Sequence, residues 1–279
     1  MISIIGFGSC GNNIASLFEG QKKYKTFYFS RNIEEDKKHI KLPYHSAMKR
    51  EECEKNIPNI KHLDIDNNVQ VFLSGTSFSS NYVLGILEQI KDRDIEIYYI
   101  KPDIDLLFGL DRLQERVMFG VLQEYARSGL FKSITIISNK NLENILGNVP
   151  VKRYYETLNN TIYYLVSYIN YLNNTKPLLG NLKEPSEVQR IRTFGMVNVN
   201  SLEEKMLFNL DTERDVCYYL LYNKDKLEND GELHRKLLDK LKNKPRNAFK
   251  NITYSIFESG SDENIGFCVA HTNVVQINP

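Results

Sequence analysis

Three glycines near the start of the chain have a spacing that could bind a phosphate group. Gly6, Gly8 and Gly11 follow an apolar run at residues 2–5 and precede residues 12–19, whose apolar side chains recur at helical spacing. Glycine lets the backbone approach a ligand closely, and the start of a helix offers unpaired N–H groups and the positive end of its dipole. The pattern predicts a strand, a phosphate-binding turn and a helix, with a tight turn that binds nothing as the alternative.

A second turn, at residues 74–80, carries hydroxyl groups. It follows another buried apolar run, residues 69–73, and precedes a predicted helix that continues to about Ile90. Hydroxyls at a helix start can donate to phosphate oxygens. The same side chains can instead serve as an ordinary helix cap. The residues concerned are Ser74, Thr76, Ser77, Ser79 and Ser80.

The first glycine turn fits two kinds of nucleotide site. A dinucleotide-binding fold usually has an acidic residue about 20 positions later, at the end of the second strand, to hold a ribose hydroxyl. Here the predicted second strand, residues 26–30, is followed by Arg31, which suits a phosphorylated ribose. No histidine or tyrosine–lysine pair stands out as catalytic. An NAD(P)-binding Rossmann oxidoreductase therefore stays an alternative.

Strands and helices alternate along the first half of the chain. This order predicts a Rossmann-like parallel sheet with helices on both faces and a nucleotide at the carboxyl ends of the strands. A helix at residues 151–173 is far longer than the average of about 11–12 residues. We expect an α/β protein with a nucleotide-binding domain at 1–149, a central helix at 150–175 and a smaller mixed α/β domain at 176–279. Further predicted strands are 95–100, 133–137, 194–199, 216–222, 252–258 and 267–275, further helices are 110–128, 202–208 and 232–241, and 31–68 are loops with short helices.

Several stretches, taken in order, resemble proteins of the tubulin/FtsZ family. Residues 8–14, GSCGNNI, are similar to the tubulin loop GQCGNQIG. Residues 71–79 stand where the family has its phosphate loop GGGTG(S/T)G, with strict matches at Gly75 and Thr76. Residues 100–102 resemble VTKPF of FtsZ, and residues 133–147 resemble LITIPNDKL…VLG. Residues 194–196 resemble the FtsZ strand GYAMM.

The resemblance implies a guanine-nucleotide site. In the family an aromatic at the head of the central helix stacks on the base, and an Asn or Asp four to five residues later reads the base edge. Tyr155 with Asn159 or Asn160 fits these roles, since residues four apart share a helix face. Packing against the sheet is the alternative for Tyr155, and for Cys10 a small buried hydrophobe. The other implied contacts are Gly8, Ser9, Cys10, Asn13, Gly75, Thr76, Ser77, Arg112 and Asn139.

Hydrolysis in that family is shared between subunits. A loop after the central helix supplies an acidic residue to the nucleotide of the neighbouring subunit. Glu187 is the first candidate here and Glu184 the second, with solvated surface acids as the alternative. The serine-rich second turn replaces several glycines of the family loop, so the resemblance implies a GTPase with a divergent phosphate loop, with slow or lost hydrolysis as the alternative.

The resemblance implies a cytoskeletal protein that binds GTP or GDP with Mg²⁺ and polymerises head to tail, similar to the divergent tubulin-like proteins of bacteria, plasmids or phages. A DNA-associated adaptor or a cargo protein would be its partner. A degenerate scaffold that binds nucleotide weakly or not at all is the alternative from another class.

The composition limits other classes of function. A net charge of +1 gives no general attraction to nucleic acid or to anionic lipid. The four cysteines lie far apart, which signals neither a zinc site nor a disulfide framework. We expect a cytoplasmic protein without a membrane-inserted segment, since no apolar run reaches about 18 residues.

Overall fold

The computed structural model describes residues 1–45, 48–180, 182, 185–244 and 250–277. Its strands fall into two halves of the chain. The first half contributes β1 (Ile2–Phe7), β2 (Tyr24–Ser30), β3 (His39–Lys41), β4 (Asn68–Leu73), β5 (Asp94–Lys101) and β6 (Ser133–Ser138). The second contributes β7 (Leu179–Gly180), β8 (Ile191–Val197), β9 (Glu204–Met206), β10 (Asp215–Tyr222), β11 (Asn251–Glu258) and β12 (Ile265–Thr272).

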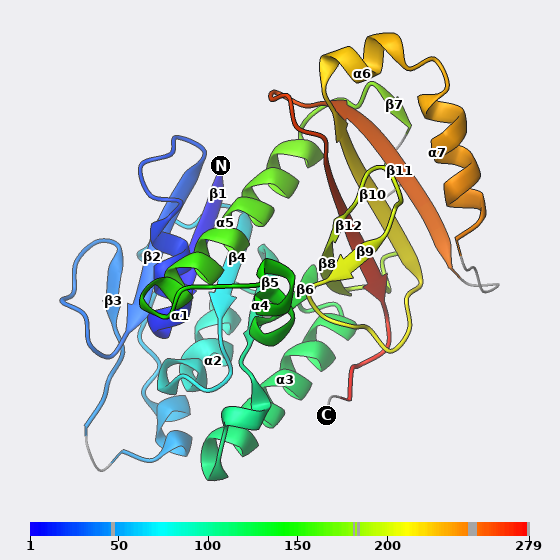
Figure 1. The fold of residues 1–279 in the computed structure, drawn as a ribbon. Helices are drawn as coiled ribbons and strands as arrows, with labels where there is room; N and C mark the ends of the chain where they lie inside the picture. The colour runs from blue at the N-terminus through cyan, green and yellow to red at the C-terminus, as the bar shows by residue number, and fades with distance from the viewer. Residues whose placement is uncertain (46–47, 181, 183–184, 245–249, 278–279) are drawn as a thin grey trace.

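All described strands belong to one sheet. Its order is β3-β2-β1-β4-β5-β6-β8-β12-β10-β11-β7, and β9 pairs with β8 off this path. Strands β1 to β6 are parallel throughout. Five of the six residues of β1 and of β4 are buried, as expected for parallel strands covered on both faces. The carboxyl ends of β1, β4, β5 and β6 therefore meet at one edge of the sheet. This edge is on the lower side of the sheet in the view of Figure 1.

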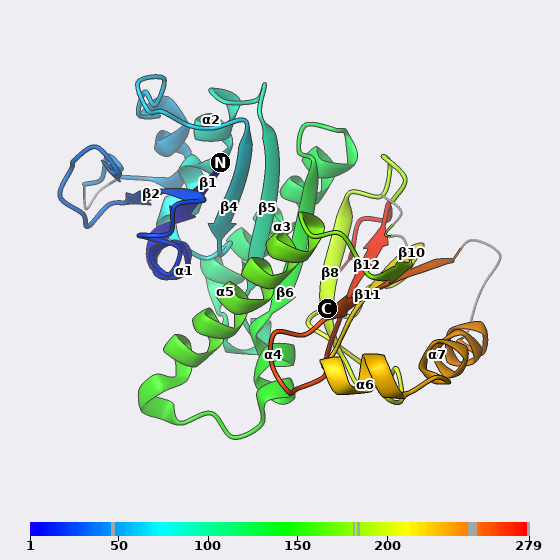
Figure 2. The same ribbon diagram turned by 90° about the horizontal axis from the view of Figure 1, so that it is seen from above.

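Helices cover both faces of the parallel half. One face packs against α1 (Gly8–Ser16), α4 (Asn139–Leu146) and α5 (Tyr154–Asn173). The other packs against α2 (Val83–Glu88) and α3 (Gly109–Arg127), so that the sheet lies between two layers (Figure 2). Four short 3-10 helices complete this half: η1 (Arg50–Lys55), η2 (Phe78–Tyr82), η3 (Ile104–Leu106) and η4 (Val151–Arg153).

Helix α5 connects the two halves of the molecule. Its predicted apolar stripe is buried at Leu158, Ile162, Leu165, Val166, Ile169 and Leu172. The Asn170 amide exchanges hydrogen bonds of 2.8 and 2.9 Å with Gln70, near the start of β4. Near the same end, the Tyr219 hydroxyl of β10 donates to Asn173 at 2.9 Å. Because its last turns lie at the amino ends of the strands, its first turns extend toward the carboxyl edge.

The second half is a mixed sheet. Among the described residues, the strand pairing between the two halves consists of Ile134 with Ile191 and Thr135 with Arg192. Beyond β8, the pairs β8–β12, β12–β10 and β11–β7 are antiparallel, and β10–β11 is parallel. Buried residues of α7 (Leu233–Lys242) pack on one face, and α6 (Lys224–Asn229) precedes it. The predicted α/β class with a parallel sheet is confirmed.

Several predicted elements differ from the structure. The helix predicted at 202–208 is wrong: this segment forms β9, because Met206 pairs with Gly195 of β8 and the backbone of Leu202 turns at φ 59°. Helix α1 begins at Gly8 and not at residue 12, because the glycine turn is itself the first helical turn. Strands β3 and β7 and helices α4 and α6 were not predicted. The division into three domains stays a prediction.

Candidate functional site

The first glycine turn has an open helix start. Phe7 ends β1, and α1 starts directly at Gly8. Phe7 provides no side-chain cap, and the first turn of α1 carries no acidic residue. The first N–H groups of α1 lack intrahelical partners, and a phosphate oxygen is a fitting acceptor for them. This helix start could therefore bind a phosphate oxygen.

The first and second turns touch. Gly8 has φ +67°, and a Cβ there would lie 2.3 Å from Ser77 Oγ. A Cβ on Gly11 would lie 2.1 Å from the Phe72 carbonyl oxygen of β4, and a Cβ on Gly6 would meet the backbone of α1 itself. Packing within the chain therefore explains why all three positions are glycine. The spacing of these glycines alone does not require a ligand.

Some hydroxyls of the second turn are used within the turn itself. Ser77 caps η2 by accepting from the Ser79 amide at 3.3 Å, and the Ser80 hydroxyl donates to the Ser74 carbonyl at 2.5 Å. Ser79 and Ser80 are buried, whereas Thr76 and Ser77 are half-buried. The helix-cap interpretation thus holds for Ser77, while the Ser80 hydroxyl holds the turn together by donating to its backbone. Thr76 remains the candidate hydroxyl donor to a ligand.

Helix α3 contacts the second turn, residues 74–80, through a hydrogen bond. Gln114 Nε2 donates to the Ser77 carbonyl at 3.0 Å, while its buried Oε1 has no partner among the described residues. A Cβ on Gly75 would lie 2.1 Å from the Tyr99 hydroxyl, so glycine at this position is also explained by close packing. Beneath it, Glu115 accepts from buried Lys101 at 2.6 Å and from Tyr99 at 3.3 Å.

The head of α5 lies near α4, which follows the carboxyl end of β6. The Tyr154 hydroxyl donates to Glu143 of α4 at 2.8 Å, and the Tyr154 and Tyr155 rings meet edge to face at 5.2 Å. Tyr155 is 70% exposed, whereas Asn159 is 8% exposed. An exposed ring is available to stack on a base. Asn160 is half-buried one residue further on.

Arg112 lines a cleft at the carboxyl ends of β5 and β6. The cleft has a volume of about 600 Å³, within the range of ligand sites. Its walls come from both halves of the chain and include Lys101, Asp105, Arg112, Lys140, Phe208 and Gln276. None of the predicted residues of the first two turns or of α5 lines it. Asn139, the first residue of α4, is half-buried. It lies in the sequence between Ser138 and Lys140, which both line the cleft.

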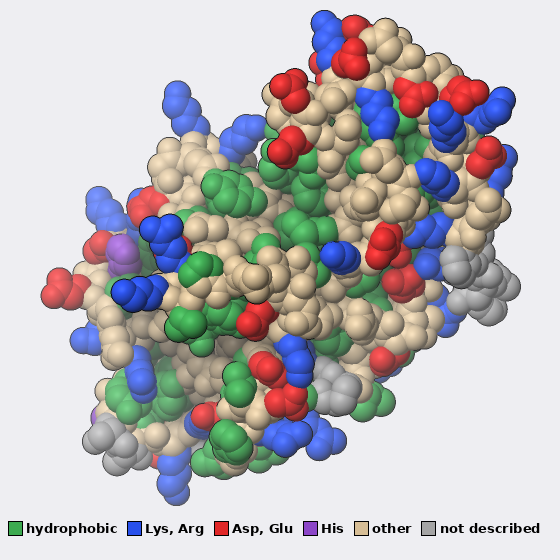
Figure 3. Space-filling model, in the orientation of Figure 1, with side chains coloured by type: hydrophobic (Ala, Val, Ile, Leu, Met, Phe, Trp, Pro, Cys, Tyr) green, Lys and Arg blue, Asp and Glu red, His purple; other side chains and the backbone are tan. Residues whose placement is uncertain are grey.

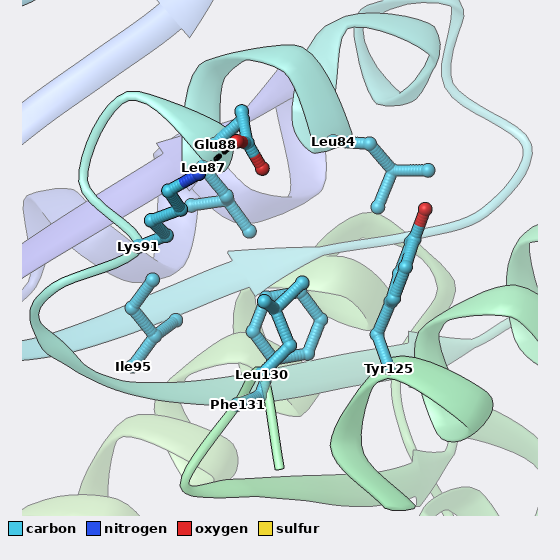
Figure 4. Close-up of a pocket in the computed structure, with 8 residues that line it drawn as sticks. All are labelled: Leu84, Leu87, Glu88, Lys91, Ile95, Tyr125, Leu130 and Phe131. Carbon is cyan, nitrogen blue, oxygen red and sulfur yellow. Dashed lines mark hydrogen bonds and ion pairs between the residues drawn. The ribbon is translucent and has the colours of Figure 1, made fainter. Parts of the chain in front are cut away.

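A smaller cavity lies on the α2–α3 side of the sheet (Figure 4). Its volume is about 60 Å³, space for about two water molecules at roughly 30 Å³ each. Apolar side chains of Leu84, Leu87, Ile95, Leu130 and Phe131 form most of its wall. This cavity is too small for a nucleotide.

The remaining residues of the first turn differ in exposure. Ser9 and Asn13 are exposed, and Cys10 is half-buried against the α1–α5 layer. Burial raises the pKa of the Cys10 thiol to about 12, so it stays protonated at neutral pH. The thiol is therefore a neutral contact and a poor nucleophile.

A magnesium ion would need ligands other than a carboxylate cluster. Within the described residues, no group of three or more His, Cys, Asp or Glu side chains could hold a metal. Mg²⁺ usually keeps several waters and binds nucleotide phosphates with few protein ligands. The residues present fit an ion brought in by a nucleotide and not a site formed by the protein alone.

The candidate catalytic acids lie away from these turns. Glu184 falls outside the described residues, and Glu187 is exposed in a turn three residues before Arg190. The Arg190 carbonyl accepts from Ile134 at the start of β6, and its guanidinium donates to the Phe131 carbonyl at 3.3 Å. Six-residue β6 spans about 17 Å. Glu187 thus lies at the amino edge of the sheet, opposite the glycine and hydroxyl turns.

Comparison with known proteins finds similarity in structure. No protein-family model and no curated protein matches the chain in sequence. A GTPγS-form protofilament of Bacillus thuringiensis serovar israelensis TubZ matches with a TM-score of 0.69 at 13% identity, covering 97% of this chain and 86% of that one. FtsZ of M. jannaschii matches at 0.62 and 14%, covering 98% and 88%. CetZ from Methanosaeta thermophila strain DSM 6194 matches at 0.65 and 13%, covering 98% and 86%.

The chain has the tubulin/FtsZ fold. The resemblance seen in the motifs is confirmed at the level of the fold, across both halves and the central helix. In this chain, α5 is the helix that connects the parallel half of the sheet to its mixed half. No described helix is long and apolar enough to cross a membrane.

The sequence alone did not reveal some of the residues that support the site. Gln114 holds the second turn, and Lys101 forms a buried ion pair with Glu115 under it. Lys101 lies in the stretch that resembles VTKPF, but its partner is 14 residues away on another element. A single sequence shows a polar helix residue without showing that it is buried, so these contacts had no readable signal.

Proposed function

We propose that this protein is a tubulin/FtsZ-like cytoskeletal protein that binds guanine nucleotide and assembles head to tail into filaments. The carrying observation is the separation of Glu187 from the glycine and hydroxyl turns, at opposite edges of one sheet. One copy cannot bring these two features together, but a second copy stacked on the first can. Repeated contacts of this heterologous kind build filaments.

The nucleotide would lie across the carboxyl edge. Its phosphates would face the uncapped start of α1 at Gly8 and Ser9, with Thr76 of the adjoining turn. Its base would stack on exposed Tyr155, with Asn159 or Asn160 and Asn139 as hydrogen-bond partners. Base stacking on an aromatic ring is worth about 1–3 kcal/mol in nucleic-acid complexes. In this proposal residues 1–149 form the domain that binds the nucleotide, and residues 150–175 form the helix that connects the two domains. Residues 176–279 form the smaller domain, which carries Glu184 and Glu187.

Hydrolysis would need two subunits. Glu187, or Glu184, of one copy would orient the water that attacks the terminal phosphate bound by the next copy. A positioned carboxylate contributes typically about 10²–10⁴-fold. Mg²⁺, when bound with the nucleotide, would neutralise phosphate charge. The chain itself would bind the phosphates at the start of α1 and would supply the acidic residue from the amino edge of the sheet.

The test combines nucleotide binding, light scattering and phosphate release. We expect about one guanine nucleotide per chain, and assembly with GTP that GDP or nucleotide-free buffer does not support. Glu187→Ala should retain binding and lose turnover. Unchanged turnover in the combined variant Glu184→Ala, Glu187→Ala would refute the shared site.

A scaffold that binds little nucleotide is the second candidate. It is favoured by the glycines, whose presence packing explains, and by Ser77 and Ser80, whose hydroxyls serve the turn itself. Purified protein without guanine nucleotide, and assembly indifferent to GTP, would support it.

The oxidoreductase alternative would use Arg31 to bind a phosphorylated ribose; its guanidinium lies over the Tyr44 ring at 4.7 Å. NAD⁺ and NADP⁺ belong in the same binding assay, as the ligands this alternative requires.

A further inference from the structure

Arg31 lies at the carboxyl end of β2 and contacts two aromatic rings. It follows Ser30, the last residue of β2, and is half-buried. Its guanidinium carbon lies 4.7 Å from the centre of the Tyr44 ring and 5.9 Å from that of the Phe78 ring. Within the part of the chain that the structure describes, its side chain forms no ion pair and no hydrogen bond. This cation is therefore available to an anion from outside the chain.

The two rings hold the guanidinium in place. Tyr44 and Phe78 meet edge to face at 5.0 Å, and the centre of the Phe78 ring lies 6.3 Å from that of Tyr82. Tyr82 is fully buried, and its hydroxyl donates to the Pro43 carbonyl. A guanidinium that lies over an aromatic face keeps its N–H groups free, because they point outward in its own plane. Arg31 is therefore positioned with its donors unused.

This guanidinium adjoins both of the candidate phosphate turns. Phe29 of β2 pairs with Phe7, the residue before Gly8, and neighbouring strands lie about 4.8 Å apart. Phe78, under the guanidinium, directly follows Ser77, whose hydroxyl lies against Gly8. The start of α1, the second turn and the cation thus form one continuous surface at the carboxyl edge of the sheet.

The layers of the molecule indicate which phosphate lies nearest to Arg31. In the proposed site the base lies at Tyr155 and Asn139, at the heads of α5 and α4, which pack on one face of the sheet. Phe78 packs with the apolar cluster on the opposite face. A nucleotide with its base on the first face and its phosphates across the two turns therefore ends near Arg31. The terminal phosphate is the group that GTP has and GDP lacks.

Acidic side chains are present around Arg31, but none of those described pairs with it. They lie in the loop after β2 and on η1, which packs against η2: Glu34, Glu35, Asp36, Glu52 and Glu54. Asp36 accepts from two backbone amides at 2.7 Å, and Glu52 lies 3.9 Å from the His45 ring. Figure 3 shows Lys and Arg side chains interspersed with Asp and Glu on the left of the molecule, where Figure 1 places β2 and β3. Because this surface has mixed charge, affinity for phosphate depends on the position of Arg31 itself.

We propose that Arg31 binds the terminal phosphate of the guanine nucleotide and supplies positive charge there, so that the chain prefers GTP to GDP even without a divalent cation. This inference rests on the proposed nucleotide site and assigns its selectivity for the triphosphate to one side chain. The planar guanidinium can donate two parallel hydrogen bonds to phosphate oxygens. Mg²⁺, when it is bound with the nucleotide, adds to the same charge, so the contribution of Arg31 is largest in its absence.

The test measures GTP and GDP affinity by isothermal titration calorimetry, in EDTA and again with Mg²⁺. Arg31→Gln removes the charge. Arg93→Gln is the matched control, because Arg93 is exposed directly before β5, at the opposite edge of the sheet. In EDTA, Arg31→Gln should lower GTP affinity at least about tenfold and GDP affinity less than about threefold. Added Mg²⁺ should reduce the loss of GTP affinity, and the control should bind both nucleotides as the unchanged protein does.

GDP binding shows whether a variant is folded. An Arg31→Gln protein that retains GDP affinity has an intact site, so its loss of GTP affinity belongs to the terminal phosphate. An unchanged GTP affinity in this variant, a control that loses as much, or a preference for GTP that exists only with Mg²⁺ would overturn the proposal. If Arg31→Gln binds neither nucleotide, Tyr44→Leu decides, because it keeps the charge and removes one ring. It should weaken GTP binding more than GDP binding, and equal losses would overturn the proposal.

Two further ligands separate this inference from the nucleotide proposal. If inorganic tripolyphosphate binds as tightly as GTP and Arg31→Gln loses both, the role of Arg31 stands and guanine recognition is removed. Binding of GTP and GDP that Arg31→Gln leaves unchanged would retain the nucleotide site and remove the role of Arg31. NADP⁺ bound through Arg31 in preference to NAD⁺, with no guanine nucleotide bound, would assign the side chain to a phosphorylated ribose and would overturn both.

Discussion

At the scale of single residues, the first turn depends on the absence of side chains. Gly8 has a positive φ and lies against Ser77, while Gly20 has φ +78° and open space, with no atom within 4 Å of the place a Cβ would take. Substitutions at the two glycines therefore distinguish the cost of backbone strain from the cost of close packing. Positive φ costs an ordinary residue roughly 1–2 kcal/mol, and overpacking adds about 1–3 kcal/mol.

Gly8→Ala should lower the free energy of unfolding by about 2–5 kcal/mol, since it meets both costs. Gly20→Ala should cost about 1–2 kcal/mol, because it meets the strain alone. Urea unfolding of both variants measures the difference. Equal losses would mean that the first and second turns are not in contact.

His271 on β12 gives a pH-dependent prediction. Burial, followed by the nearby charge of Arg192, lowers its pKa from 6.5 to about 3. The unfolded chain takes up a proton below pH 6.5 and the native chain does not until about pH 3, so stability falls as the pH drops through this window. The backbone of Gln189 and the carboxylate of Glu96 oppose the shift but do not reverse it.

Between pH 7 and pH 4.5, the unchanged protein should lose about 2 kcal/mol more unfolding free energy than His271→Gln. Urea titrations of the two proteins at both pH values provide this difference, in which the other titrating groups cancel. An identical loss in the two proteins would show that His271 is protonated in the native state.

At the scale of elements, α3 provides a matched pair of buried glutamines. Gln114 donates to the second turn, whereas Gln123, two and a half turns later, pairs with the backbone of Gln276 near the end of the chain. Loss of a buried hydrogen bond costs about 1–3 kcal/mol. The two positions differ in which segment they hold.

Gln114→Ala should weaken GTP binding by about tenfold, corresponding to about 1.4 kcal/mol, because the second turn loses its support. Gln123→Ala should destabilise the fold by a similar amount and leave GTP affinity unchanged. Isothermal titration calorimetry and urea unfolding report the two effects separately. A GTP affinity equally affected by both substitutions would contradict this role for Gln114.

At the scale of the whole molecule, the two edges of the sheet divide the proposed activity between copies. If Glu187 acts on the nucleotide of a neighbour, GTP turnover per chain should rise steeply with protein concentration and then level off. Phosphate release measured from dilute to concentrated protein tests this. Turnover per chain that is constant over the whole range would place the catalytic group within one copy.

Much of the fold could be predicted from local sequence pattern. Apolar runs of four to six residues located the parallel strands, and the stripe from Leu158 to Leu172 located α5, because strand and helix periods differ. Residues 202–208 were wrongly predicted as a helix, since their pairing partner Gly195 belongs to another strand. Short elements such as β3 and β7 have too few residues to show a period.

The sequence by itself determined the positions of the glycine turn, the hydroxyl turn and the long helix, because turn formation and periodicity depend on neighbours in the chain. Tertiary structure alone decided that Gly8 meets Ser77, that Gln114 and Glu115 face inward, and that Glu187 lies at the far edge. It also decided which apolar face of α3 is buried, since Met118 and Leu122 face the sheet while Leu113 and Val117 face outward. Both faces are apolar in sequence, and only packing against the sheet distinguishes them.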